Sequence, residues 1–131
     1  MDKIQLIKLP HFKDERGELV PIELKEHLNW EAKRVYYAFN NKETRGGHAH
    51  RTEKELFICA RGSFTAKVHD GKEWHEYKLE GPEDAIYVDN WIWHEFTDFS
   101  EDGILLAVSS TNYDPSDYVR DFDQFLKEVN Q

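Results

Sequence analysis

Short runs of β-branched and aromatic residues, separated by turn residues, recur along most of this 131-residue chain. Runs of roughly 4–8 such residues between turn signals are typical of antiparallel sandwiches and barrels, and they disfavour alternating strand and helix units. Strands are predicted near residues 4–9, 18–23, 34–40, 47–50, 55–61, 63–69, 74–79, 85–88, 92–99 and 104–110. We therefore expect an all-β fold whose barrel closes near Ser110.

The last part of the chain follows a different period. Apolar residues recur there at helical spacing, at Val119, Phe122, Phe125, Leu126 and Val129. This spacing predicts an amphipathic helix from about Tyr118, lying on the outside of the barrel. No internal repeat or linker interrupts the pattern, so residues 1–131 are expected to form a single domain.

Composition limits the partners and the compartment. The chain has 26 Asp and Glu against 17 Lys and Arg, a formal charge of -9, which disfavours nucleic acid and anionic membranes as partners. A phosphate-bearing ligand would therefore have to meet local arginines. The single cysteine, Cys59, lies in an apolar run and is expected to be buried. No signal-peptide core and no apolar run of roughly 20 residues is present, so a soluble, cytoplasmic protein is expected.

The segment Arg45-Gly46-Gly47-His48-Ala49-His50 is the strongest chemical signal. Alternate residues of a strand share a face, so His48 and His50 lie together, beside the guanidinium of Arg45. Single histidines are more often packed or exposed than functional, but a pair on one face favours a site. An imidazole inside a barrel can remove a proton from a carbon next to a carbonyl, and a second can return it.

Two further residues have a functional and a structural interpretation. Tyr36 shares a strand face with Arg34, so its hydroxyl could line the barrel and donate to an enolate oxygen. It could equally be a tyrosine packed in the core or in a dimer. Arg16 follows Asp14 in a turn and, taken alone, is expected to be solvated. The remaining histidines, His11, His27, His69 and His75, have no partner pattern and are expected at the surface.

The order of His48, His50, Glu55 and a later His94 resembles the cupin superfamily, whose motifs gather three histidines and a glutamate inside a small barrel. The match is partial. Lys42 stands where the first motif opens with Gly, and Asp89-Asn90-Trp91 replaces the Pro-x-Gly turn of the second. The resemblance implies a cupin-type jelly-roll barrel, here followed by a short C-terminal helix.

A closer resemblance runs through nearly the whole chain. It rests on five segments: Asp14-Glu15-Arg16-Gly17, Arg34-Val35-Tyr36-Tyr37, Arg45-Gly46-Gly47-His48-Ala49-His50, Trp93-His94-Glu95 and Asn112-Tyr113-Asp114-Pro115-Ser116-Asp117-Tyr118-Val119-Arg120. Together they are similar to the sugar 3,4-ketoisomerases that act on TDP-4-keto-6-deoxyglucose in deoxyamino-sugar biosynthesis.

That resemblance implies roles for individual residues. His48 would be the main catalytic base and Tyr36 its polar partner, with His50 also catalytic and His94 lining the site. Arg16 and Arg45 would approach the sugar nucleotide, and Arg34 is included among the substrate-binding residues. The reaction would pass through an enediol without a cofactor. At the position of Arg16 the chain resembles the branch that gives the galacto product.

The resemblance also implies a homodimer that exchanges N-terminal strands. The apolar residues Ile4, Leu6, Ile7 and Leu9 make a short segment before the barrel proper. An unpaired edge strand of this kind invites pairing with another chain, so residues 4–9 are predicted to cross to the partner.

Three alternatives stay open at this point. Glu55 stands where many ketoisomerases carry Gln, so His48, His50, Glu55 and His94 could form a metal-cupin site for iron, manganese, nickel or zinc. The Arg-containing segments also resemble TDP-4-keto sugar 3,5-epimerases. A cupin barrel can, finally, simply bind a sugar without turning it over.

Overall fold

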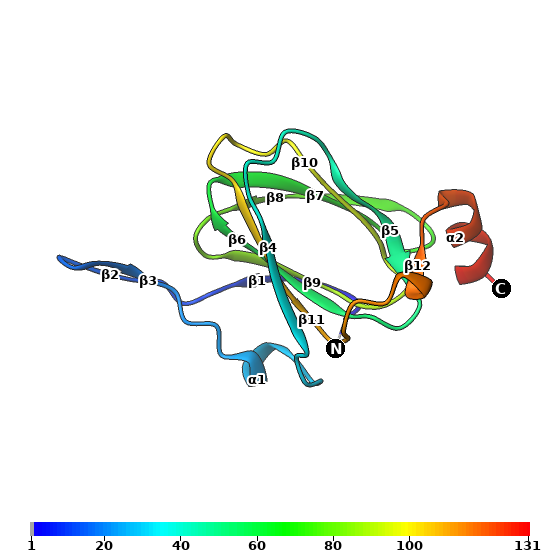
Figure 1. Cartoon of the computed structure of the whole chain (residues 1–131), viewed down its shortest axis with the longest axis horizontal. Coiled ribbons are helices and arrows are strands. Elements are labelled where there is room, and N and C mark those ends of the chain that lie inside the picture. Colours follow the sequence, from blue (N-terminus) through cyan, green and yellow to red (C-terminus); the bar gives the residue numbers. More distant parts are fainter. Residues whose placement is uncertain (1) are drawn as a thin grey trace.

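Two five-stranded antiparallel sheets face one another in the computed structural model, which describes residues 2–131 (Figure 1). The first sheet has the order β1 (Ile4–Lys8), β9 (Asp84–Val88), β6 (Glu55–Arg61), β11 (Ile104–Ser109) and β4 (Arg34–Ala38). The second has the order β12 (Tyr118–Val119), β5 (Arg45–His50), β10 (Trp93–Thr97), β7 (Ser63–His69) and β8 (Trp74–Glu80). The all-β prediction is confirmed.

Apolar side chains cover both faces of the first sheet. Between the two sheets lies a cluster that includes Phe57, Ile86 and Phe96. A second cluster on the outer face of the first sheet is covered by residues 20–32, which include the short helix α1 (Leu24–His27). Strands buried on both faces read as continuous apolar runs, and β6 is accordingly buried from Glu55 to Cys59.

The C-terminal segment corrects two predictions. The helix α2 (Phe122–Val129) begins four residues later than expected, because the Asp121 side chain accepts from Gln124 N and caps it there. After the 3-10 turn η1 (Pro115–Asp117), Tyr118 and Val119 instead form β12, paired with β5. The barrel therefore does not close at Ser110, because a later strand still joins the second sheet.

Helix α2 packs on the end of the barrel next to β12 and β5. Phe125 is fully buried against a cluster that includes Ala49, Trp93 and Val119. His69 lies against Phe122 and Phe125 and is only 6% exposed, so the expectation that it is a surface residue was wrong. Its Nδ1 accepts from Gly71 N, which satisfies the buried ring within the β7–β8 turn.

The N-terminal part is divided between the barrel and a projecting hairpin. β1 pairs with β9 of the same chain along its whole length, so the segment predicted to be an unpaired edge is paired here. The strands β2 (Phe12–Asp14) and β3 (Gly17–Leu19) form a separate two-stranded sheet that extends away from the barrel (Figure 1). The strand expected at residues 18–23 thus ends at Leu19. Within residues 2–131, no helix is long and apolar enough to cross a membrane.

Candidate active site

Three imidazoles gather on the inner face of the second sheet. His48 of β5 and His94 of β10 are direct cross-strand partners, and His50 follows two residues after His48 on the same face. The ring centroid of His48 lies 4.8 Å from those of both His50 and His94. The alternation of β5 therefore brings the predicted pair together, and the pairing with β10 adds the third ring.

The glycines before His48 allow this close pairing. Gly46 has a φ of +87°, and a Cβ built there would lie 2.7 Å from the carbonyl oxygen of His94. The register shifts between His94 and Glu95, opposite this point, as at a β-bulge. Only a residue without a side chain fits between the two backbones, which gives a physical reason for Gly46 in the motif.

The first sheet supplies a tyrosine and a carboxylate to the opposite wall. The Tyr36 hydroxyl on β4 donates to Glu55 Oε2 on β6 at 2.5 Å. The strand between them, β11, presents the small, fully buried residues Ala107 and Ser109 in register with Tyr36 and Glu55. These small side chains leave room for Tyr36 and Glu55 to meet across the intervening strand.

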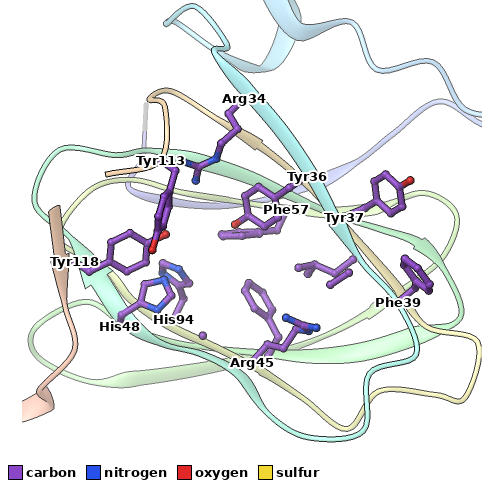
Figure 2. A pocket seen from close by; sticks show the side chains of 14 residues that line it. Arg34, Tyr36, Tyr37, Phe39, Arg45, His48, Phe57, His94, Tyr113 and Tyr118 are labelled. Atoms are coloured by element: carbon purple, nitrogen blue, oxygen red, sulfur yellow. The ribbon is translucent and has the colours of Figure 1, made fainter. Parts of the chain in front are cut away.

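A cavity of about 500 Å³ lies between the two walls. Figure 2 shows Tyr36 and Phe57 on one side, His48 and His94 on the other, and Tyr118 closing one end. Arg45 lies near the opposite end of this group. Of the predicted site residues, the cavity is lined by Arg34, Tyr36, Arg45, His48 and His94.

Two predicted residues lie outside this lining. His50 is only 2% exposed and sits behind the cavity wall, covered by the rings of His48 and Tyr118. His50 is therefore not positioned to contact a ligand in the cavity. It can affect such a ligand only through its neighbours His48 and Tyr118. Arg16 lies at the tip of the β2–β3 hairpin, 87% exposed and bound to Asp14 at 2.6 Å, away from the cavity of its own chain.

The C-terminal segment contributes residues that were not singled out from the sequence. The Tyr118 ring lies 4.6 Å from that of His48 and 4.3 Å from that of His50. The Asp117 carboxylate accepts from the backbone N–H groups of Thr52 and Glu53, at 2.9 and 3.0 Å, and so ties this segment to the loop after β5. The motif from Asn112 to Arg120 marked this segment in the sequence. Only the pairing of β12 with β5 shows that the segment lies against His48 and His50.

A buried ion pair supports the same wall. Arg34 Nη2 lies 3.0 Å from Glu53 Oε2, and its guanidinium is 5.3 Å from the Tyr36 ring centroid and 5.8 Å from that of Tyr113. Glu53 is 1% exposed and also accepts from the Thr111 hydroxyl at 2.9 Å. Arg34 is therefore anchored beside the cavity, within cation–π distance of two aromatic rings.

Burial keeps the imidazoles neutral. It lowers the pKa of His48 to about 2, with positive charge on His94, His50 and Arg120 acting in the same direction. Burial also lowers the pKa of His94 to about 4, against the opposing charge of Glu55, and lowers the pKa of His50. On the opposite wall, burial and then the charge of Glu55 raise the pKa of Tyr36, which keeps it a hydroxyl.

The cavity thus combines proton acceptors with a proton donor. A neutral imidazole at the wall, His48, can take a proton from a bound carbon acid. Across the cavity, Tyr36 can donate to an oxygen on which negative charge develops. Such a pair suits proton transfer next to a carbonyl group.

The four residues of the predicted metal site do not all converge. Nitrogen atoms of His48, His50 and His94 lie within 4.8 Å of one another, close enough for these three residues to hold a metal ion. Glu55 is not part of that group. Its Oε2 is held by Tyr36 and its Oε1 faces His50 Nε2 at 3.1 Å, so the carboxylate serves as a partner to these residues and the four-ligand cupin set is incomplete.

Comparison with known proteins agrees with the site. The FdtA family, described as WxcM-like, C-terminal, matches residues 2–130. The chain belongs to the FdtA family. A curated relative from Aneurinibacillus thermoaerophilus, TDP-4-oxo-6-deoxy-alpha-D-glucose-3,4-oxoisomerase, is 39% identical over 118 residues, which are 88% of this chain and 85% of the relative. The predicted membership of the sugar 3,4-ketoisomerases is confirmed, and the chain is an isomerase of that class.

Solved structures of sugar 3,4-ketoisomerases superimpose closely on this fold. A 3,4-ketoisomerase, QdtA from Thermoanaerobacterium thermosaccharolyticum, in complex with TDP, is 33% identical with a TM-score of 0.91, covering 98% of this chain and 95% of that one. The WlaRB TDP-quinovose 3,4-ketoisomerase from Campylobacter jejuni is 32% identical with a TM-score of 0.88, covering 97% and 99%. These matches confirm the predicted cupin-type barrel with its C-terminal helix.

The epimerases share the barrel. NovW, a 4-keto-6-deoxy sugar epimerase from Streptomyces spheroides, is 20% identical with a TM-score of 0.77, covering 89% of this chain and 68% of that one. At this identity the likeness describes the fold only.

The buried imidazoles predict that stability falls with acid. An unfolded chain takes up these protons near pH 6.5, whereas the folded state keeps His48 and His94 neutral to about pH 2 and 4. The unfolded state therefore binds more protons below pH 6.5, and His94 alone should cost up to about 3 kcal/mol between pH 6.5 and 4. Urea unfolding from pH 7.5 to 4 should show this loss. Glu53, whose pKa burial raises, opposes part of this loss, because the folded state binds its proton more readily than the unfolded chain. A free energy of unfolding that stayed level from pH 7 to 5 would contradict the prediction.

Proposed function

We propose that this protein converts TDP-4-keto-6-deoxyglucose into the TDP-3-keto-6-deoxy sugar of galacto configuration, by His-mediated proton transfer. The observation that carries the proposal is the pairing of a neutral imidazole, His48, with a hydroxyl donor, Tyr36, on opposite walls of one cavity. The name of the Aneurinibacillus relative specifies the same kind of substrate for that protein. The solved QdtA complex with TDP supports the same choice of nucleotide.

The chemistry moves one hydrogen between neighbouring carbons. The ketone at C4 acidifies the proton on C3, and His48 Nε2 or Nδ1 removes it while the C3–C4 double bond forms. Oxygen O4 takes a proton, which gives a 3,4-enediol. Return of a proton to C4 and loss of the O3 proton then leave a ketone at C3. Tyr36 faces the cavity as the hydroxyl that stabilises the developing negative charge on oxygen.

Arginines at the cavity suit the nucleotide. The protein has a formal charge of -9, so an anionic pyrophosphate needs local cations. Arg45 lines the cavity and its Nε donates to the neutral Asn41 side chain, which leaves its charge uncompensated by that contact. Arg34 is neutralised by Glu53, so we assign it to holding the wall and the sugar, and assign the phosphates to Arg45.

Turnover and product identity test this function directly. Wild-type protein incubated with TDP-4-keto-6-deoxyglucose in deuterated water should give a 3-keto product, identified by NMR, with the axial C4 hydroxyl of the galacto series. His48→Asn keeps a similar size but no titratable nitrogen, so turnover should fall at least about 100-fold. His75→Asn, at a half-buried histidine that does not line the cavity, is the matched control. A folded His48→Asn protein with normal turnover would contradict the base assignment, and a labelled C5 with an unmoved ketone would favour an epimerase.

We propose further that the protein acts as a homodimer through its projecting hairpin. The hairpin β2–β3 exposes Phe12 and Leu19, each 61% exposed, and a two-stranded hairpin alone is marginally stable in water. On the barrel, Val35 and Tyr37 are 61% and 66% exposed on the edge strand β4. A second copy would cover such apolar surface. Because β1 is paired within its own chain, we assign the exchange to this hairpin, which would carry Arg16 to the partner's cavity.

Mixing two inactive variants tests the exchange. Arg16→Ala and His48→Asn should each lose activity, but subunits mixed at equal ratio, unfolded and refolded should recover about a quarter of the wild-type rate, because each mixed dimer of a two-fold assembly keeps one intact site. Phe12→Asp should produce monomers by light scattering, whereas the neighbouring Lys13→Glu should not. No recovery on mixing, or a fully active monomer, would contradict the proposal.

The proposed mechanism uses no metal. After exhaustive chelation and elemental analysis, metal-free protein should keep full turnover, because the base and the donor are side chains of the chain itself. The control is untreated wild-type protein. Glu55→Gln would not serve as a control, because Glu55 also contacts Tyr36 and His50. Loss of activity that returns with one divalent ion would favour a metal cupin built on His48, His50 and His94.

A further inference from the structure

The enediol of the proposed reaction has two neighbouring oxygens that change charge in turn. Negative charge develops on O4 while the C3 proton leaves, and on O3 while the new ketone forms. A hydroxyl has a single hydrogen to donate, so Tyr36 serves one acceptor at a time. In this structure that hydrogen is directed to Glu55 Oε2, 2.5 Å away. The second sugar oxygen therefore needs a donor other than Tyr36.

Tyr118 lines the same cavity on the side of the histidines. Figure 2 shows its ring reaching from the C-terminal segment toward the cavity, beside His48. Within residues 2–131, the hydrogen bonds of Tyr118 are made by its backbone. It pairs with His50 across the strands, its N–H donates to Pro115 O, and its carbonyl oxygen accepts from Arg51 Nη1 at 3.3 Å. Its hydroxyl is thus left to meet a ligand in the cavity.

Contacts on several sides fix the Tyr118 ring before any ligand binds. The guanidinium of Arg120 lies 4.4 Å from the ring centroid. The His50 ring meets it edge-on, with the centroids 4.3 Å apart, and the Tyr113 ring lies at 5.9 Å. A donor that is already held in place needs no reorganisation when charge develops on its acceptor. The hydroxyl of Tyr118 is therefore preorganised.

Strand pairing sets the position of this ring relative to the proposed base. Tyr118 is the direct cross-strand partner of His50, and His48 lies two residues away on the same face of β5. Tyr118 and His48 are therefore diagonal neighbours, a distance that long side chains bridge. The Asp117 carboxylate accepts from Thr52 N at 2.9 Å and so fixes this register at the end of β5. Base and hydroxyl are thus positioned by the same pair of strands.

Other potential donors around the cavity are placed differently. Tyr37 is 66% exposed, and Figure 2 shows its hydroxyl directed away from the histidines. Tyr113 is 63% exposed. Arg45 lies near the end of the cavity opposite Tyr118. Tyr118 is the cavity-lining tyrosine whose ring contacts that of His48, with the centroids 4.6 Å apart. Its hydroxyl is accordingly the donor closest to the carbon from which His48 would take the proton.

We propose that Tyr118 is a further catalytic residue, a second hydroxyl donor to the O3 and O4 pair of the sugar. The inference rests on the proposed ketoisomerase function. With the sugar between the two walls, Tyr36 donates to one oxygen from the first sheet and Tyr118 donates to the other from the second. His48 remains the base that acts on carbon. Tyr118 donates a hydrogen bond and keeps its proton, so this role adds no proton transfer and no co-reactant to the reaction.

Removing the hydroxyl alone separates a donor from a packing residue. Tyr118→Phe keeps the ring against His48 and His50, so kcat should fall at least about 10-fold because a donor to developing charge is lost. The dissociation constant for TDP, measured by calorimetry, should stay within about twofold of wild type, because TDP has no sugar for this hydroxyl to contact. The matched control is Tyr77→Phe on β8, outside the cavity lining, which should keep its kcat.

A double-mutant cycle tests whether the two hydroxyls act on different oxygens. In that case the losses from Tyr36→Phe and Tyr118→Phe are independent, and kcat of the double variant should fall by about the product of the two single losses. Thermal melting and the TDP affinity establish that each variant is folded. Wild-type kcat in Tyr118→Phe, a loss explained by weaker TDP binding, or a double variant no slower than Tyr36→Phe would overturn the inference. A wild-type protein without turnover would count instead against the proposed function.

Discussion

Burial of three imidazoles and two carboxylates between two β-sheets is the constraint on which the rest of this structure depends. Glu53 and Glu55 are each 1% exposed, and His50 and His94 are each 2% exposed. Removing a charge from water costs several kcal/mol unless it is paired or neutralised. The fold meets this cost by pairing Glu53 with Arg34, giving Glu55 the Tyr36 hydroxyl, and keeping the imidazoles uncharged. Groups held in this way have altered proton affinities, which is what acid–base chemistry requires.

The cluster also explains the arrangement of the strands around it. A close approach of β5 to β10 needs Gly46, because a Cβ there would meet the backbone of β10. The contact from β4 to β6 needs small residues at Ala107 and Ser109 of the strand between them. The short strand β12 then places Tyr118 over His48 and His50. Small residues thus position the large functional ones, although none of the small residues carries chemistry.

The chain as a whole is acidic, but three arginines lie at or near the cavity. The whole chain carries a formal charge of -9, whereas Arg34, Arg45 and Arg120 lie at or near the cavity. Arg120 stacks on the Tyr118 ring at 4.4 Å, and its charge helps to hold the pKa of His48 low. An anionic ligand would be attracted to these cations, and its charge would raise the proton affinity of the nearby His48, which favours that imidazole as a proton acceptor.

The sequence by itself determined the fold class and the family, and it singled out most of the polar side chains that line the cavity. Strand periodicity and turn residues gave the all-β barrel, and the alternation in β5 placed His48 and His50 on one face, because side-chain direction in a strand is a local property. Residue order also carried the family resemblance. Helix α2 was placed only approximately, since the pairing of Tyr118 with His50 overrode helical spacing that begins at Val119. Local pattern cannot reveal such a long-range partner.

Only the tertiary structure decided which side chains meet. The sequence offered Glu55 as a metal ligand, but its place across Ala107 and Ser109 from Tyr36 makes it a hydrogen-bond partner of that tyrosine. His50 shares the face of His48 and was expected to line the site, yet Tyr118, which follows it by 68 positions (118 - 50), covers it. Arg16 was expected near the nucleotide, and the hairpin carries it away from its own cavity. Hydrophobic periodicity and composition describe residues that are close in sequence. These contacts join residues far apart in sequence, so their geometry is fixed only when the strands pair and the two sheets pack together.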